Sequence, residues 1–308
     1  MPSWTNLSYA NVATTSPAAH RVSLEWSEAL ARGGAAEFDG EAEKNGMMPL
    51  RRAAARLLSC DIGDVCVGSS ATELLCSLAW AISPPSGSNI VSTRASFPST
   101  VYPWRRVAEE NGAEIRLAGH DENLYTDPEE IFALIDQDTS VVTLSHVEYS
   151  NGQRYDLPRF AEAAHSVGAT LIVDATQSMG MLPIDASATG ADALVSSGYK
   201  WLRGTYGAAV GYISPSVRGD LVPGLLGFRS HTDLWDLRAD RLELAGGHHC
   251  VRVCGDGLYA FGRHRRSNLD GRHPEHSASY RGSSHSGVAT GESSGGGWGG
   301  NASGRSGG

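Results

Sequence analysis

Lysine is almost absent from this chain of 308 residues. The 25 basic residues comprise 23 arginines and two lysines, Lys44 and Lys200. Chemistry that needs the primary amine of a side chain, such as formation of a Schiff base, therefore has two candidates in the sequence. Lys44 lies in the polar run EAEKNG, which we interpret as a solvated loop. Lys200 is left as the candidate for chemistry.

Long apolar runs and an excess of positive charge are also missing. No stretch approaches the roughly 18 consecutive apolar residues of a transmembrane helix, so we expect no membrane-spanning segment. The 34 acidic and 25 basic residues give a formal net charge of -9. This charge argues against nucleic acid or an anionic membrane surface as a partner.

Cysteine is scarce, and its spacing is irregular. The five cysteines are odd in number and form no disulfide framework, so we expect free thiols in a reducing compartment. The first residues, MPSWTNLSYANV, contain neither the basic nor the apolar region of a secretory signal. Both observations predict a cytoplasmic protein. The spacing of His248, His249, Cys250 and Cys254 matches no common zinc site, so we expect no metal there.

The composition changes near residue 242. Residues 243–308 contain 17 of the 37 glycines, 6 of the 11 histidines and no lysine. Such a segment cannot bury enough apolar surface to offset its conformational entropy. We therefore expect a folded domain over residues 1–242 and a disordered tail over residues 243–308.

Within the predicted domain, apolar strands alternate with helices. We expect helices over 48–60, 71–82, 98–112, 127–135 and 156–168, and strands over 89–93, 113–119, 140–147, 169–176, 191–198 and 207–214. Pro103 is expected to kink its helix or to delay its start. Mostly apolar strands separated by helices predict an α/β fold with a mostly parallel sheet that helices cover on both faces.

A helix N-terminus suited to binding an anion is predicted at GSSATE. Ser70 and Glu73 have the spacing of a capping box, which places the start of the helix at Ala71. The amides of Ala71 and Thr72, the Thr72 hydroxyl and the helix dipole would together attract a phosphate. An ordinary capped helix is the alternative interpretation of this pattern alone.

Two polar side chains follow the apolar strand LIV. Asp174 stands at its carboxyl end, where α/β sheets place their ligands, and Gln177 lies in the loop above the same edge. A carboxylate in this position needs a cationic or hydrogen-bonding partner. An aspartate that merely caps the junction between strand and helix is the alternative.

Lys200 follows another apolar strand, within SSGYKW. Flanking by Tyr199 and Trp201 predicts partial burial, and burial favours the neutral, nucleophilic amine. A lysine, a strand-end aspartate and a helix N-terminus are the groups that pyridoxal phosphate needs for its aldehyde, its pyridine nitrogen and its phosphate. An aromatic ring over the cofactor is also expected, and Phe97 is the candidate.

At these motifs the chain resembles a known family. The stretch IVDATQSMGMLPIDASATGADALVSSGYKWLRGTYGAAVGYIS, with SSATELL and SHVEYSNGQRYDL before it, resembles the class V aminotransferase superfamily of pyridoxal-phosphate enzymes. That superfamily includes cysteine desulfurases, kynureninase-like hydrolases and isopenicillin-N-epimerase-like proteins. The resemblance covers roughly residues 5–240 and implies the large domain of a fold-type-I pyridoxal-phosphate transferase.

The resemblance also implies roles for individual residues. It assigns the Schiff base to Lys200, the contact with the pyridine nitrogen to Asp174 and a hydrogen bond to the phenolic oxygen of the cofactor to Gln177. The implied phosphate contacts are Ala71, Thr72, Ser197 and Tyr199, and the implied stacking ring is Phe97.

The chain departs from the family pattern at several of these positions. Tyr199 stands where desulfurases usually carry histidine, and FPS at 97–99 is similar to the kynureninase branch. Tyr149 occupies a place where many relatives have asparagine, so it is not counted among the predicted site residues.

The resemblance implies an enzyme that acts on a small amino-acid substrate and forms a homodimer. An aminotransferase is the first interpretation of the activity. A cysteine desulfurase or another lyase, hydrolase or epimerase of the same fold is the alternative. Neither Cys250 nor Cys254 lies in a context that matches the desulfurase nucleophile, and the substrate stays undetermined.

The resemblance ends abruptly after Gly247, where relatives continue into a small C-terminal domain that supplies an arginine for the substrate carboxylate. The following mix of Gly, Arg, His and Ser is expected when a GC-rich gene is read out of register. Codons for His248–Cys254, moved by one nucleotide, permit Thr-Thr-Ala-Phe-Glu-Phe, similar to the segment of the relatives. We interpret the tail as a frameshift product; a naturally disordered tail is the alternative. A cofactor-binding but inactive protein is therefore a third interpretation of the function.

Overall fold

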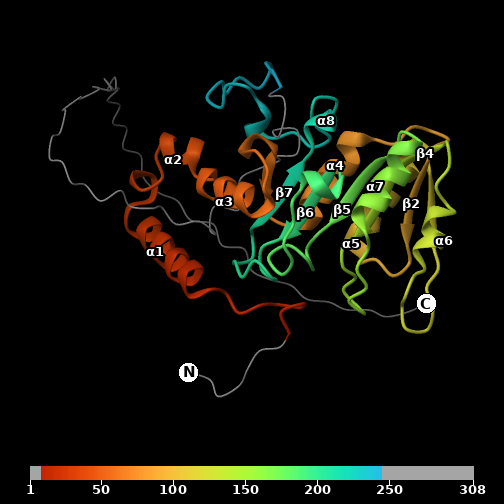
Figure 1. Cartoon of the computed structure of the whole chain (residues 1–308). Helices are drawn as coiled ribbons and strands as arrows, with labels where there is room; N and C mark the ends of the chain where they lie inside the picture. The colour runs from red at the N-terminus through yellow and green to blue at the C-terminus, as the bar shows by residue number, and fades with distance from the viewer. Residues whose placement is uncertain (1–7, 245–308) are drawn as a thin grey trace, which may run out of the picture. The chain divides into compact units, whose positions relative to one another are not determined.

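The computed structural model describes residues 8–244, which form a seven-stranded sheet with helices on both faces (Figure 1). The strand order is β1-β7-β6-β5-β4-β2-β3. All of the predicted tail except residues 243 and 244 lies outside the described residues, as does the cluster from His248 to Cys254. The boundary at residue 242 and the frameshift therefore stay predictions.

The sheet is mostly parallel, as the sequence predicts. β3, β2, β4, β5 and β6 run parallel to one another, whereas β7 is antiparallel to both β6 and β1. A parallel return would need a crossover of about a dozen residues or more, usually with a helix, and the short β6–β7 connection contains none. The strands are β1 (Val65–Gly68), β2 (Asn89–Thr93), β3 (Glu114–Ala118), β4 (Thr139–Ser145), β5 (Thr170–Asp174), β6 (Ala193–Ser197) and β7 (Ala209–Ile213).

The predicted helices are confirmed, most of them with shorter bounds. They correspond to α3 (Met48–Leu58), α4 (Ala71–Ile82), α5 (Pro98–Asn111), α6 (Pro128–Phe132) and α7 (Leu157–Ser166). The sequence patterns used above did not predict β1, α1 (Pro17–Gly33), α2 (Gly40–Asn45) or α8 (Pro215–Arg218). None of the helices within residues 8–244 is long and apolar enough to cross a membrane.

Two local expectations were wrong in part. Lys44 is exposed, but it lies in α2 rather than in a loop, because the carboxylate of Asp39 accepts a hydrogen bond from the amide of Ala42 and caps this helix. The start of α5 is not delayed to Pro103. Instead α5 begins at Pro98, whose fixed φ suits the first helical position, and it continues through Pro103.

The two faces of the sheet carry separate cores, and this separation positions the candidate site. Val142 and Leu144 of β4 pack in the core that includes residues of α3 and α7, whereas Val141 packs in the core that includes residues of α4 and α5. Since side chains alternate along a strand, Ser145 and Asp174 point to the α4–α5 face at the carboxyl ends of two paired strands.

Candidate active site

One cavity at the carboxyl ends of β4, β5 and β6 brings together all eight residues that the sequence analysis singles out. They are Ala71, Thr72, Phe97, Asp174, Gln177, Ser197, Tyr199 and Lys200. The other lining residues are Ser99, Ser145, Val147, Tyr149 and Thr176. The structure thus places the predicted residues side by side, while their roles stay predictions.

The N-terminus of α4 forms one wall of the cavity. The hydroxyl of Ser70 accepts a hydrogen bond from the amide of Glu73 at 3.1 Å, as expected for the cap. The carboxylate of Glu73 reaches back to the amide of Ser69 at 2.6 Å, one residue before the position that a capping box requires. The amide of Ala71 donates to the hydroxyl of Ser197 at 3.2 Å, and the Thr72 hydroxyl donates to Ser99 at 3.0 Å. Hydroxyl and amide groups thus meet where the helix dipole favours an anion.

Asp174 lies on the floor of the cavity and is 6% exposed. Its carboxylate accepts hydrogen bonds from the amide of Thr176 at 2.9 Å and the hydroxyl of Thr100 at 3.3 Å. Burial raises the pKa of Asp174, while Thr176, the charge of Lys200 and Thr100 act in the opposite direction. A positive group at this place would favour the ionised carboxylate.

Lys200 lies beside the aromatic ring of Phe97. Its Nζ atom is 5.5 Å from the centre of the Phe97 ring, and Phe97 meets Tyr149 edge to face with 5.3 Å between ring centres. Burial lowers the pKa of Lys200, which the negative charge of Asp174 raises in part. The lowered pKa increases the share of neutral, nucleophilic amine near neutral pH.

Gln177 and Tyr199 are both held by neighbouring groups. The side-chain amide of Gln177 donates to the carbonyl of Ala10 and accepts from the indole of Trp201, each at 2.8 Å. The Tyr199 ring stacks on Tyr206 with 4.4 Å between centres. Contacts within the protein thus orient these two side chains of the cavity.

Several residues of the site were missed by the sequence analysis. Thr100 and Thr176 hydrogen-bond to Asp174, and Tyr149 lines the cavity although its departure from the family pattern excluded it from the predicted site. No local signal distinguishes these two threonines from others. For Tyr149, its position four residues after the end of β4 was a signal that it lies at the carboxyl edge of the sheet.

Glu148 lies between two cavity residues but is itself 1% exposed. Its Oε1 atom accepts a hydrogen bond from the hydroxyl of Ser96 at 2.8 Å, and its Oε2 atom has no partner in the described structure. Burial raises the pKa of Glu148 to about 7, and the charge of Asp174 adds to this effect. Glu148 therefore titrates near neutral pH beside the segment that carries Phe97.

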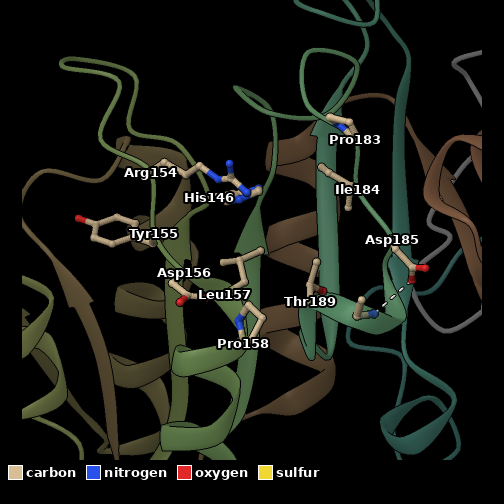
Figure 2. Close-up of a pocket in the computed structure, with 11 residues that line it drawn as sticks. His146, Arg154, Tyr155, Asp156, Leu157, Pro158, Pro183, Ile184, Asp185 and Thr189 are labelled. Atoms are coloured by element: carbon tan, nitrogen blue, oxygen red, sulfur yellow. Dashed lines mark hydrogen bonds between the residues drawn. The ribbon is translucent and has the colours of Figure 1, made fainter.

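A second cavity is lined by His146, which directly follows Ser145 of the first cavity in the sequence (Figure 2). The side chains of His146 and Arg154 lie close together there, at the side of α7 and the loop that contains Asp185. Burial, with a smaller contribution from Arg154, lowers the pKa of His146 to about 4, so its ring is neutral at pH 7. None of the predicted site residues lines this cavity. Among residues 8–244, no group of three or more His, Cys, Asp or Glu side chains is placed to hold a metal ion.

Comparison with known proteins shows the family of this chain. The family model "Aminotransferase class-V" matches residues 13–235. A probable cysteine desulfurase of Methanothermobacter thermautotrophicus is 35% identical over 141 residues, which cover 46% of this chain and 35% of the relative. The kynureninase of Pseudomonas fluorescens is 36% identical over 135 residues, which cover 44% of this chain and 31% of the relative.

A solved structure shares the fold. A mutant of C-DES with glycine covalently linked to its PLP cofactor superposes with a TM-score of 0.72 at 21% identity, covering 82% of this chain and 67% of that one. The matched region spans about a third of the length of the two curated relatives.

Proposed function

Since the chain belongs to the class V aminotransferase family, we propose that it is a pyridoxal-phosphate-dependent enzyme that acts on an amino acid through a Schiff base at Lys200. The observation that carries the proposal is the cavity in which the amine of Lys200, the carboxyl group of Asp174 and the N-terminus of α4 meet. We further propose aminotransferase activity, a homodimeric state and a cytoplasmic location.

The surroundings of Asp174 fit the pyridine ring of this cofactor. The carboxyl group is buried, and its two hydrogen bonds come from neutral donors, the Thr176 amide and the Thr100 hydroxyl. A buried carboxylate is stabilised by a positive partner, and a protonated ring nitrogen would provide one. Asp174 would in turn keep the proton on that nitrogen.

The N-terminus of α4 fits the phosphate group. The hydroxyls of Thr72, Ser99 and Ser197 gather around the first turn, where the helix dipole attracts negative charge. Among the lining residues that the structure describes, Asp174 is the one acidic side chain, so no other described side chain of the lining repels an anion.

Lys200 would both hold the cofactor and move a proton. When bound, pyridoxal phosphate supplies an electron sink for the negative charge that develops on the α-carbon of an amino acid. The Lys200 amine would hold the aldehyde of the cofactor, and its lowered pKa would allow the neutral amine to accept a proton from that carbon. The ring of Phe97 would cover one face of the cofactor and exclude water from it.

Cleavage of the substrate side chain is the alternative to transamination, because the curated relatives include a probable cysteine desulfurase and a kynureninase. A desulfurase needs a cysteine thiolate beside the substrate. No cysteine within residues 8–244 lines the cavity, and burial raises the pKa of both Cys60 and Cys76. This disfavours a desulfurase for the described part of the chain.

Borohydride reduction tests the proposal. The full chain is incubated with pyridoxal phosphate, reduced and mapped by mass spectrometry. We expect the pyridoxyl label on Lys200, no label in Lys200→Ala and an unchanged label in the control Lys44→Arg. A label on Lys44, or no label, would overturn the proposal.

A screen of amino acids then separates the activities. Release of a keto acid with formation of the pyridoxamine form of the cofactor indicates transamination. Release of a fragment of the side chain indicates cleavage. A labelled protein that converts none of the amino acids is a cofactor-binding but inactive protein.

A further inference from the structure

The side-chain amide of Gln177 is fixed by two partners of opposite character. Trp201 Nε1 can only donate a hydrogen bond and lies 2.8 Å from Gln177 Oε1, whereas the Ala10 carbonyl can only accept and lies 2.8 Å from Gln177 Nε2. Rotating the amide by 180° would place donor against donor and acceptor against acceptor. The surroundings therefore permit one orientation of this side chain.

This orientation determines what Gln177 can offer to a ligand. Gln177 lines the cavity and is 7% exposed. Its amide nitrogen carries two hydrogens, and Ala10 takes one of them. The second remains available to an oxygen acceptor in the cavity, so the residue is prepared as a donor.

The partner of Gln177 belongs to a segment that also holds the Lys200 loop. In this N-terminal strap (residues 9–16), the Ala13 amide donates to the carbonyl of Tyr199 at 3.1 Å, and the Ser16 amide donates to the carbonyl of Arg203 at 2.9 Å. These contacts lie on both sides of Lys200 in the sequence. The strap thus joins the loop of Lys200 to the side chain of Gln177.

Two further contacts strengthen this arrangement. The ring of Tyr9 lies 5.8 Å from that of Trp201, and the guanidinium of Arg203 lies 5.8 Å from the Tyr9 ring. Arg203 has a φ of 53°, a left-handed conformation that is unfavourable for a residue with a Cβ. Its Nε atom donates to the carbonyl of Thr14 at 3.2 Å, so the strap also stabilises this residue.

We propose that Trp201 and the N-terminal strap are positioning elements of the cavity, which lock the Gln177 amide as a hydrogen-bond donor to an oxygen of the bound cofactor. The proposal rests on the proposed function for the identity of that oxygen. Trp201 acts through Gln177 and is a positioning residue, not a catalytic one.

The substitution Trp201→Phe removes the indole N–H and keeps a ring beside Tyr9. Loss of one hydrogen bond costs about 0.5–1.5 kcal/mol. We therefore expect the affinity for pyridoxal phosphate to be about 2- to 10-fold weaker. A hydrogen-bond donor beside the phenolic oxygen of the cofactor stabilises the anionic form of that oxygen. Without a fixed donor, the pKa reported by the visible absorbance of the cofactor joined to Lys200 should be about 0.5 to 1 higher in this variant. Trp235→Phe, at an exposed tryptophan outside the cavity lining, is the matched control.

A double-mutant cycle distinguishes positioning from general structural support. In the background Gln177→Ala, the change Trp201→Phe should alter neither the affinity nor the titration. Equal effects in both backgrounds, or no effect of Trp201→Phe in the unmodified chain, would overturn the proposal.

A measurement without cofactor keeps this test separate from the proposed function. In the apo protein, Gln177→Ala should speed hydrogen exchange of the Trp201 indole N–H, followed by NMR, by about 5- to 10-fold. Unchanged exchange would overturn the positioning role even if Lys200 takes the label. A chain that shows the expected exchange but takes no label at Lys200 would instead contradict the proposed function.

Discussion

The Nζ atom of Lys200 lies 5.5 Å from the centre of the Phe97 ring. The two residues are 103 positions apart in the chain and meet because α5 begins, and β6 ends, at the carboxyl edge of the sheet. The rings of Phe97 and Tyr149 pack edge to face. A flat ligand joined to Lys200 would therefore have an aromatic face within reach.

Phe97→Ala should weaken the binding of pyridoxal phosphate by about 2- to 10-fold, since an aromatic contact contributes about 0.5–1.5 kcal/mol beyond its buried area. Equilibrium titration of the visible absorbance measures this change. Tyr102→Ala, which removes an exposed ring of α5 that does not line the cavity, should leave the affinity unchanged. Equal losses in both variants would contradict a stacking role for Phe97.

Asp174→Asn should lower turnover by roughly a hundredfold or more while the borohydride label on Lys200 persists. The amide oxygen can still accept from the Thr176 amide, and the amide nitrogen can donate to the Thr100 hydroxyl, but the neutral side chain no longer favours a protonated ring nitrogen. Steady-state kinetics on the substrate found in the screen measures the effect. The control Asp192→Asn changes a buried carboxylate that contacts His165 and does not line the cavity, so it should lower stability and not turnover. Unchanged turnover in Asp174→Asn would refute the assigned role.

Glu148 should make the stability of the fold depend on pH. Burial raises its pKa from 4.5 to about 7, so between these values the folded chain keeps a proton that the unfolded chain releases. Stability should therefore fall as pH rises from about 4.5 to 7 and stay level with respect to this group above pH 7. The full difference amounts to roughly 3 kcal/mol.

Glu148→Gln should remove this dependence, because the amide oxygen can still accept from Ser96 and the side chain never ionises. Urea unfolding of the apo protein at pH 5 and pH 8 measures the difference in the free energy of unfolding between variant and unmodified chain. The variant should gain relative stability at pH 8. Glu110→Gln, at an exposed residue paired with Arg106, is the control and should show no such gain. The prediction is wrong if the free energy of unfolding changes between pH 5 and pH 8 by the same amount in Glu148→Gln and in the unmodified chain.

We expect the cofactor-loaded chain to form a homodimer. Between residues 222 and 244 it exposes seven large apolar side chains, and exposed apolar surface of this extent is typical of interaction sites. They are Val222, Leu226, Phe228, Trp235, Leu237, Leu242 and Leu244. Light scattering of the folded, loaded protein measures its mass, and a monomer would show that the expectation is wrong.

Where a pattern is local, the sequence analysis was close to the structure. The predicted helix 71–82 and strand 89–93 coincide with α4 and β2. Ser70 caps α4 through a contact three residues away, so the first of these bounds depends on neighbouring residues alone. Strand-end positions likewise placed Asp174 and Lys200 at the ligand edge of the sheet.

Where a contact spans the chain, the sequence analysis had no signal. α1 was not predicted although it starts with two local signals, Ser16 as its cap and Pro17 at its first position, whereas β1 is only four residues long. The antiparallel direction of β7 follows from the connection after β6, which contains no helix, and the strand pattern alone does not encode it. Thr100 could not be recognised as a partner of Asp174, because a hydroxyl on a helix has no pattern that names its acceptor.

The sequence by itself determined the α/β fold, the helix N-terminus at Ala71 and the near uniqueness of Lys200 as an amine, because each depends on residue type and near neighbours. Only the tertiary structure decided how Gln177 is oriented. Its partner Ala10 lies 167 residues away and offers only a backbone carbonyl, which every residue possesses. The direction of that hydrogen bond follows from the packing of the strap on the Lys200 loop, which no local pattern of side chains encodes.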